Sequence, residues 1–119
     1  MTMTQMDLLN QITRNSSLTQ LQTYNEKIAK LRGFSNESIQ ETMLALLEEV
    51  GELARAIRYT ETNMAIDTDK EQNNESIEGE VADVFVVLMT VCSKLGINLH
   101  DALIEKERKN CQRNWSQQR

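Results

Sequence analysis

Apolar residues recur every three to four positions along most of the chain, which is the spacing of an amphipathic helix. Four helical segments are predicted, at about 18–31, 39–59, 75–95 and 98–114. Serine or asparagine residues can cap the first, second and fourth, and Gly33 and Gly96 can end the first and third. There is no proline, and no segment shows the alternation of a strand. The pattern therefore predicts an all-α protein.

Two stretches lack helical periodicity. Residues 1–17 form a polar arm with a short apolar patch, and residues 60–74 are polar and predict a loop long enough for mobility or a role at a site. No linker or repeat divides the rest, so we predict one domain at 18–115 and a tail at 116–119. Short connections elsewhere favour a four-helix-bundle-like packing.

Composition narrows the class of protein. A chain of 119 residues is long enough for one core but short for an enzyme that must also enclose its substrate, so oligomerisation is expected. The net charge of −5, with acids and bases mixed, argues against nucleic acid or an anionic membrane as partner. The N-terminal residues lack the pattern of a signal peptide, and two cysteines are too few for a disulfide framework. A cytoplasmic protein with reduced thiols is predicted.

Two acidic pairs stand out in the second and third predicted helices. Glu49 and Glu52 are three residues apart, as are Glu80 and Asp83. Because residues three apart share one face of a helix, each pair can direct its oxygens to a common point. If the two faces meet, four carboxylates require a cation, since mutual repulsion would otherwise keep one or more protonated near neutral pH. Glu48 points away from this face, and we assign it mostly a surface or salt-bridge role.

The surroundings of Asp83 add to this prediction. The run from Val81 to Cys92 is apolar on nearly every side, which is typical of a helix that is buried all round. An uncompensated carboxylate there would lose several kcal/mol in desolvation, so Asp83 should be paired, protonated or bound to metal. A buried salt bridge is the plain alternative for Asp83 alone, and the second acidic pair shifts the balance toward a metal.

The last predicted helix continues its apolar stripe with polar and basic residues. After Leu99 and Leu103, the same spacing places Lys106, Asn110 and Arg113. If this stripe keeps facing inward, its outer end must meet an anion rich in acceptors, and phosphate suits Lys and the bidentate geometry of Arg. The alternative is a helix end that leaves the core, with basic groups complementing the helix dipole. Beside an acidic metal cluster the phosphate interpretation is favoured.

Together these residues resemble the MazG-type nucleotide pyrophosphohydrolases of the all-α NTP pyrophosphatase superfamily. The resemblance covers about residues 36–115. It rests on LEEVGEL at 47–53, EVADV at 80–84, GINL at 96–99 and the segment from Lys106 to Trp115. The paired ExxE and ExxD motifs, followed by KxxxN, are a specific combination, whereas ExxE alone would mean little.

The resemblance implies a MazG fold, assembled as a homodimer or a dimer-based tetramer. It also implies Mg²⁺-dependent cleavage of a (d)NTP to the monophosphate and pyrophosphate, in house-cleaning of the nucleotide pool, with one or two Mg²⁺ ions or Mn²⁺ as a substitute. The implied metal ligands, which are also the implied catalytic residues, are Glu49, Glu52, Glu80 and Asp83. The implied substrate-binding residues are Lys106, Asn110 and Arg113 at the phosphates and Tyr59, which stands where some relatives have an aromatic that packs on the base.

A non-enzymatic helical bundle, acting as a regulatory or partner-binding module, is the alternative from another class. It predicts ordinary salt bridges around Asp83 and no response to Mg²⁺. A di-iron carboxylate bundle is disfavoured, because such bundles need ExxH motifs and no Glu stands three residues before His100, the one histidine of the sequence.

Overall fold

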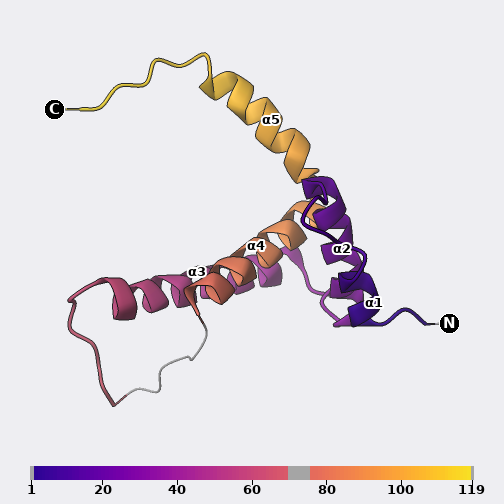
Figure 1. The fold of residues 1–119 in the computed structure, drawn as a ribbon, viewed down its shortest axis with the longest axis horizontal. Coiled ribbons are helices and arrows are strands. Elements are labelled where there is room, and N and C mark those ends of the chain that lie inside the picture. Colours follow the sequence, from indigo (N-terminus) through magenta and orange to yellow (C-terminus); the bar gives the residue numbers. More distant parts are fainter. Residues whose placement is uncertain (1, 70–75, 119) are drawn as a thin grey trace.

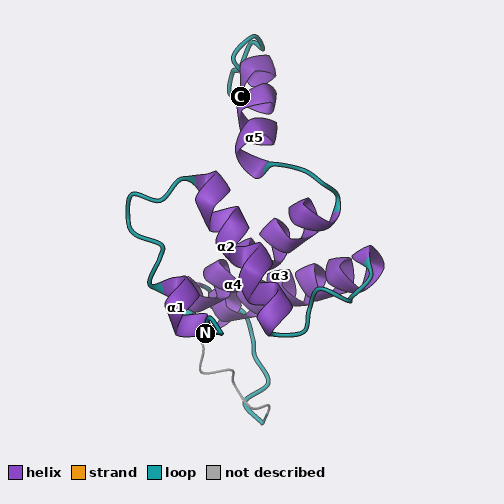
Figure 2. Cartoon of the chain, turned by 90° about the vertical axis from the view of Figure 1, so that its right-hand side faces the viewer, coloured by secondary structure: helices purple, strands orange, loops and turns teal. Residues whose placement is uncertain are grey.

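The computed structural model describes residues 2–69 and 76–118, and within these ranges the chain is helical without any strand (Figure 1). The helices are α1 (Gln5–Leu9), α2 (Leu18–Leu31), α3 (Ile39–Glu61), α4 (Ile77–Lys94) and α5 (Leu99–Asn110). Loops and turns make up the rest of the described chain (Figure 2). The predicted all-α class is confirmed.

Side-chain caps set the starts of the long helices. Each N-cap side chain accepts a hydrogen bond from the backbone N–H of the third helical residue, which satisfies one of the unpaired donors of a first turn. These caps are Ser17, Ser38, Ser76 and Asn98. Gly33 and Gly96 follow α2 and α4 with φ angles of 83° and 70°, a left-handed conformation that glycine adopts without steric strain. The predicted glycine ends of the first and third helices are therefore confirmed.

One additional helix and one earlier helix end distinguish the structure from the prediction. The N-terminal arm contains α1, which begins with a capping box between Thr4 and Asp7 that the sequence reading missed. The last helix ends at Asn110, earlier than the predicted 114. The predicted loop at 60–74 is described up to residue 69 and is free of helix from residue 62. Its remainder, and the predicted helix start at 75, lie outside the described residues.

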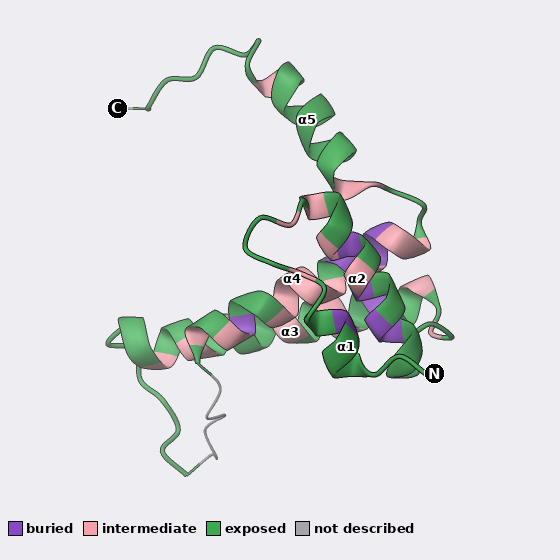
Figure 3. Ribbon diagram, turned by 45° about the vertical axis from the view of Figure 1, so that its right-hand side comes forward, coloured by how far each residue is buried: buried purple, intermediate pink, exposed green. Residues whose placement is uncertain are grey.

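The helices form an antiparallel pair with further helices at one end. α3 and α4 lie side by side along their length, α2 packs against α4, and both α1 and α5 contact α2 (Figure 1). The buried apolar side chains gather where α1, α2 and α4 meet (Figure 3), and they are Leu8, Ile28, Ala29, Met89, Val91 and Cys92. No helix of the described chain combines the length and apolar character that crossing a membrane requires.

A single chain leaves much of its apolar surface uncovered. Leu47 on α3 is 63% exposed and Val81 on α4 is 50% exposed. The prediction that residues 81–92 are buried all round is therefore wrong within one chain, because α2 and α3 are the helices that pack closely on α4. The radius of gyration is 17.7 Å, whereas a compact domain of this length has about 13.5 Å. Such an extended shape buries less of each helix than the sequence pattern implies.

Candidate functional site

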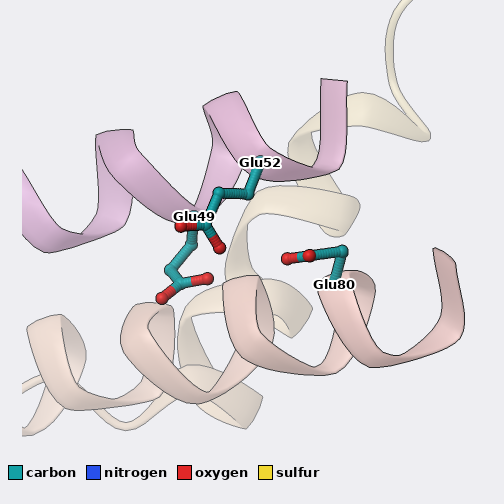
Figure 4. A group of neighbouring side chains, drawn as sticks. All are labelled: Glu49, Glu52 and Glu80. Atoms are coloured by element: carbon teal, nitrogen blue, oxygen red, sulfur yellow. The ribbon is translucent and has the colours of Figure 1, made fainter. Parts of the chain in front are cut away.

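Three of the four predicted acids converge between α3 and α4 (Figure 4). Glu49 and Glu52 project from one face of α3, and Glu80 projects toward them from α4. Each residue offers one carboxylate oxygen, and the three oxygens lie within 4.8 Å of one another. The three-residue spacing on α3 and the antiparallel packing of α4 together produce this convergence.

Burial differs among the three carboxylates. Glu80 is 1% exposed, which makes it one of the most buried side chains of the described chain. Glu49 is half-buried, and Glu52 is exposed to solvent. The sequence singled out Asp83 as the acid in the most apolar surroundings, but Asp83 is half-buried and Glu80 lies deeper. Glu80 projects toward α3 (Figure 4), whereas Asp83, one turn further along α4, lines an open cavity.

Asp83 lies next to this cluster without belonging to the triplet of close oxygens. It lines a cavity together with Glu49, and its charge contributes to the electrostatic environment of the Glu49 carboxyl. Neither of the described ion pairs, His100 with Asp101 and Lys109 with Glu105, involves Asp83. No ion pair of Asp83 itself is therefore found among residues 2–69 and 76–118.

The Glu49 carboxyl lies in surroundings that disfavour its charged form. Desolvation raises its pKa to about 7, with further contributions from the negative charges of Glu52, Asp83 and Glu80. Its Oε2 atom is buried and has no hydrogen-bond partner among the described residues. An unsatisfied buried oxygen among like charges is unfavourable, and a cation at this point would relieve both effects.

The residues present fit a hard divalent cation. All the converging donors are carboxylate oxygens, the ligand type that Mg²⁺, Mn²⁺ and Ca²⁺ prefer. Glu49 contributes an oxygen that lacks a protein partner, and Glu52 leaves one side open to solvent. Glu49, Glu52 and Glu80 are therefore the residues that can hold a metal, with Asp83 close by.

The predicted phosphate-binding residues lie elsewhere in the chain. α5 packs on α2 and leads away from the α3–α4 pair (Figure 1). Lys106 and Arg113 are exposed, and Asn110 is half-buried at the end of α5, where its backbone carbonyl oxygen accepts a hydrogen bond of 2.8 Å from Trp115 Nε1. Leu103 is also exposed, so the stripe does not face inward within one chain. The phosphate role of these residues stays a prediction.

Tyr59 lies near the C-terminal end of α3, about two turns beyond Glu52. Its ring centroid is 5.8 Å from Arg55 Cζ, within the range of a cation–π contact. Tyr59 also lines a surface cavity with Arg58 and Ile66. The described structure thus places Tyr59 beside cations, and its contact with a base stays a prediction.

Two buried polar residues near the acids were not predicted from the sequence. Asn25 on α2 and Thr42 on α3 are almost completely buried, and both line the cavity that contains Glu49 and Asp83. A signal was present, because Asn25 shares its helical face with the apolar residues Leu21 and Ile28. A polar side chain in the middle of an apolar stripe marks a buried hydrogen-bonding group.

Comparison with known proteins agrees with this geometry. Residues 37–115, more than half of the chain, match the family model of the MazG nucleotide pyrophosphohydrolase domain. No curated protein matches the chain. Among solved structures, the chain is similar to the crystal structure of YPJD from Bacillus subtilis, a candidate pyrophosphatase, with a TM-score of 0.69 and 24% identity over 86% of this chain and 100% of that one. That similarity shows the fold, and the match to the family model shows the family: the chain belongs to the MazG nucleotide pyrophosphohydrolases.

Proposed function

We propose that this protein is a Mg²⁺-dependent nucleoside triphosphate pyrophosphohydrolase that cleaves a (d)NTP to the (d)NMP and pyrophosphate. Family membership supports a hydrolase that acts on nucleotide phosphoanhydride bonds. The observation that carries the metal dependence is the convergence of Glu49, Glu52 and Glu80 oxygens within 4.8 Å. House-cleaning of the nucleotide pool is the cellular role that this activity would serve.

The proposed division of labour follows from burial. Glu80 is held between α3 and α4, so its carboxylate provides a fixed ligand. With its pKa raised to about 7, Glu49 is protonated in a large part of the molecules near neutral pH, and a cation bound at the site would displace that proton. Asp83 and the exposed Glu52 complete the set of acids. A bound Mg²⁺ supplies charge neutralisation for the triphosphate and a water molecule of lowered pKa.

We also propose that the chain works as a homodimer or a dimer-based tetramer. Leu44 and Leu47 on α3 are 62% and 63% exposed, and the exposed side of α4 adds Val81. Apolar surface of this kind on neighbouring helices favours an interface. A second copy covering α3 and α4 would complete a helical bundle. It would also allow Lys106, Asn110 and Arg113, which lie apart from the acids of their own chain, to reach the phosphates at the acids of another.

Product analysis tests the proposal. A panel of nucleoside triphosphates is incubated with the full chain in Mg²⁺, in Mn²⁺ and with EDTA, and both pyrophosphate and orthophosphate are measured. We expect pyrophosphate with the nucleoside monophosphate, and we expect EDTA to abolish its release. Release of orthophosphate with the diphosphate would contradict the proposed bond, and no release from any nucleotide would favour the non-enzymatic bundle.

A further inference from the structure

A cavity of about 300 Å³ adjoins the acidic cluster. It lies between α2, α3, α4 and the connection from α2 to α3, it is partly open to solvent, and Glu49 and Asp83 belong to its lining. Apolar side chains from α2 and α4, including Ile28 and Val87, form much of the remainder. Small-molecule sites begin at about this volume, and they typically combine apolar walls with a few fixed polar groups.

Asn25 is the most buried polar residue of this cavity, with 1% of its surface exposed. Its Nδ2 donates to Thr90 Oγ1 at 2.8 Å and to the carbonyl oxygen of Val86 at 3.3 Å. Thr90 Oγ1 itself donates to that carbonyl oxygen at 3.0 Å, so it can only accept from the amide. A flipped amide would place Oδ1 against the Val86 oxygen, and the network therefore fixes its orientation.

The fixed amide leaves an acceptor without a donor. Among the described residues, none donates a hydrogen bond to Asn25 Oδ1. Because Asn25 lines the cavity, this oxygen is available to accept a hydrogen bond from the N–H or O–H of a ligand or water.

The other buried polar groups of the cavity are also acceptors. Thr42 Oγ1 donates to the backbone oxygen of Ser38 at 3.0 Å, so its remaining capacity is to accept, as for Thr90. Arg32, a cation in the lining, is exposed and directs its Nε to Gln5 Oε1. The interior of the cavity thus presents oxygen lone pairs to a ligand.

We infer that this cavity receives the base of the nucleotide and selects cytosine and adenine, which carry an amino group at C4 of the pyrimidine or C6 of the purine, over bases with a keto oxygen at that position. Asn25 Oδ1 accepts the hydrogen bond from that amino group and is the specificity-determining atom. A keto oxygen at the same position faces another carbonyl oxygen and leaves both unpaired, which a site built around a hydrogen bond rejects strongly. The inference rests on the proposed function, because it names the substrate class of the same site.

Two pairs of substrates test it, since the members of each pair differ by one amino or keto group: dCTP with dUTP, and dATP with dITP. We expect kcat/KM to be at least about tenfold higher for the amino member of each pair, given the discrimination that a hydrogen-bonding site provides. Asn25→Ala should bring both ratios toward one, mainly by lowering kcat/KM for the amino substrates. Gln22→Ala is the matched control, because Gln22 is the other buried amide of α2 and bonds to Ile97 and Leu99 rather than lining the cavity. It should keep both ratios.

The outcomes separate the two levels of inference. If no triphosphate releases pyrophosphate, the proposed function fails. If pyrophosphate is released but the wild-type protein does not prefer the amino substrates, the specificity inference is overturned alone, and the same holds if Asn25→Ala retains the preference. The wild-type ratios decide the matter even if Asn25→Ala does not fold, which circular dichroism would reveal.

Discussion

The α3–α4 pair and α5 both carry charged residues at helical spacing, but a single chain organises only the charges of the pair. Glu49, Glu52 and Glu80 come within 4.8 Å because two long helices hold each other along their length. On α5, Lys106 and Arg113 remain exposed, because that helix contacts α2 near its beginning and then projects outward (Figure 1). Spacing along a helix therefore produces a site only where packing supplies the second helix.

The two regions also differ in the sign of their charge. The acidic cluster between α3 and α4 has an excess of negative charge, with a Glu49 oxygen that finds no hydrogen-bond partner in the described part of the chain. The last turn of α5 carries the cations Arg108 and Lys109, with Arg113 just beyond it. Cations at a helix C-terminus interact favourably with the helix dipole, so these basic residues do not require an acidic partner. Lys106 and Arg113 are exposed, and under the proposed function they would contact a triphosphate that the acids bind through a metal.

The largest expected effect comes from removing one acid of the cluster between α3 and α4. Glu49→Gln keeps the side-chain shape but removes a metal ligand, and we expect pyrophosphate release in Mg²⁺ to fall on the order of 10²-fold or more. Glu48→Gln is the matched control, since it neutralises the adjacent, exposed acid and should change the rate less than about twofold if surface charge matters little. Equal losses in the two variants would show that net charge, rather than the cluster, supports the activity.

The next effect concerns the interface that would bring α5 to another chain. Leu47→Asp places a charge on the exposed apolar side of α3, and we expect the dimer dissociation constant to rise on the order of 10²-fold, because burying an unpaired charge is strongly unfavourable. Sedimentation velocity over a range of concentrations measures it. Met6→Asp on α1, where the wild-type side chain is 60% exposed, is the control. An unchanged mass for Leu47→Asp would remove this surface from the interface.

A mixing experiment then asks which chain the cations of α5 serve. Lys106→Ala and Glu49→Gln are each expected to have little activity, and the two are co-expressed or refolded together. If α5 acts on the acids of another chain, a mixed dimer contains one intact site. Random pairing in a symmetric dimer should then restore roughly a quarter of wild-type activity. Activity no higher than the average of the two variants would place the cations and the acids of one site on the same chain.

Local features of this chain were predictable, and features that depend on packing were not. Caps such as Ser17 and Ser38, and the face shared by Glu49 and Glu52, follow from a few neighbouring residues. The deeper burial of Glu80 than of Asp83 depends on how α4 rotates against α3, which no local pattern fixes. The role of Asn25 depends on hydrogen bonds to Thr90 and Val86, more than sixty positions away.

α1 was missed for a related reason. It is five residues long, too short for apolar periodicity to register, and its evidence is the capping box between Thr4 and Asp7. The position of α5 could not be predicted, because its apolar stripe would suit either its own chain or a second copy. The sequence of one helix shows which of its faces is apolar, but which helix or chain packs on that face depends on the whole fold.

The smallest effect is a pH dependence of stability that arises from Glu49 in the cluster between α3 and α4 and not from α5. Between about pH 4.5 and about 7 the folded chain holds a proton on Glu49 that the unfolded chain has released, so the free energy of unfolding falls as the pH rises through this range. After allowance for solvent screening of a half-buried group, we expect a loss of about 1 kcal/mol, measured by urea unfolding in EDTA at pH 5 and pH 8. Glu49→Gln should remove this loss, and Mg²⁺ at pH 8 should recover stability in the wild type. Glu41→Gln is the control. The hydrogen bonds from Ser38 lower the Glu41 pKa, so the stability that Glu41 adds is lost only below the pH range of the experiment, and this variant should keep the slope. A slope that persists in Glu49→Gln would assign the titration to another group.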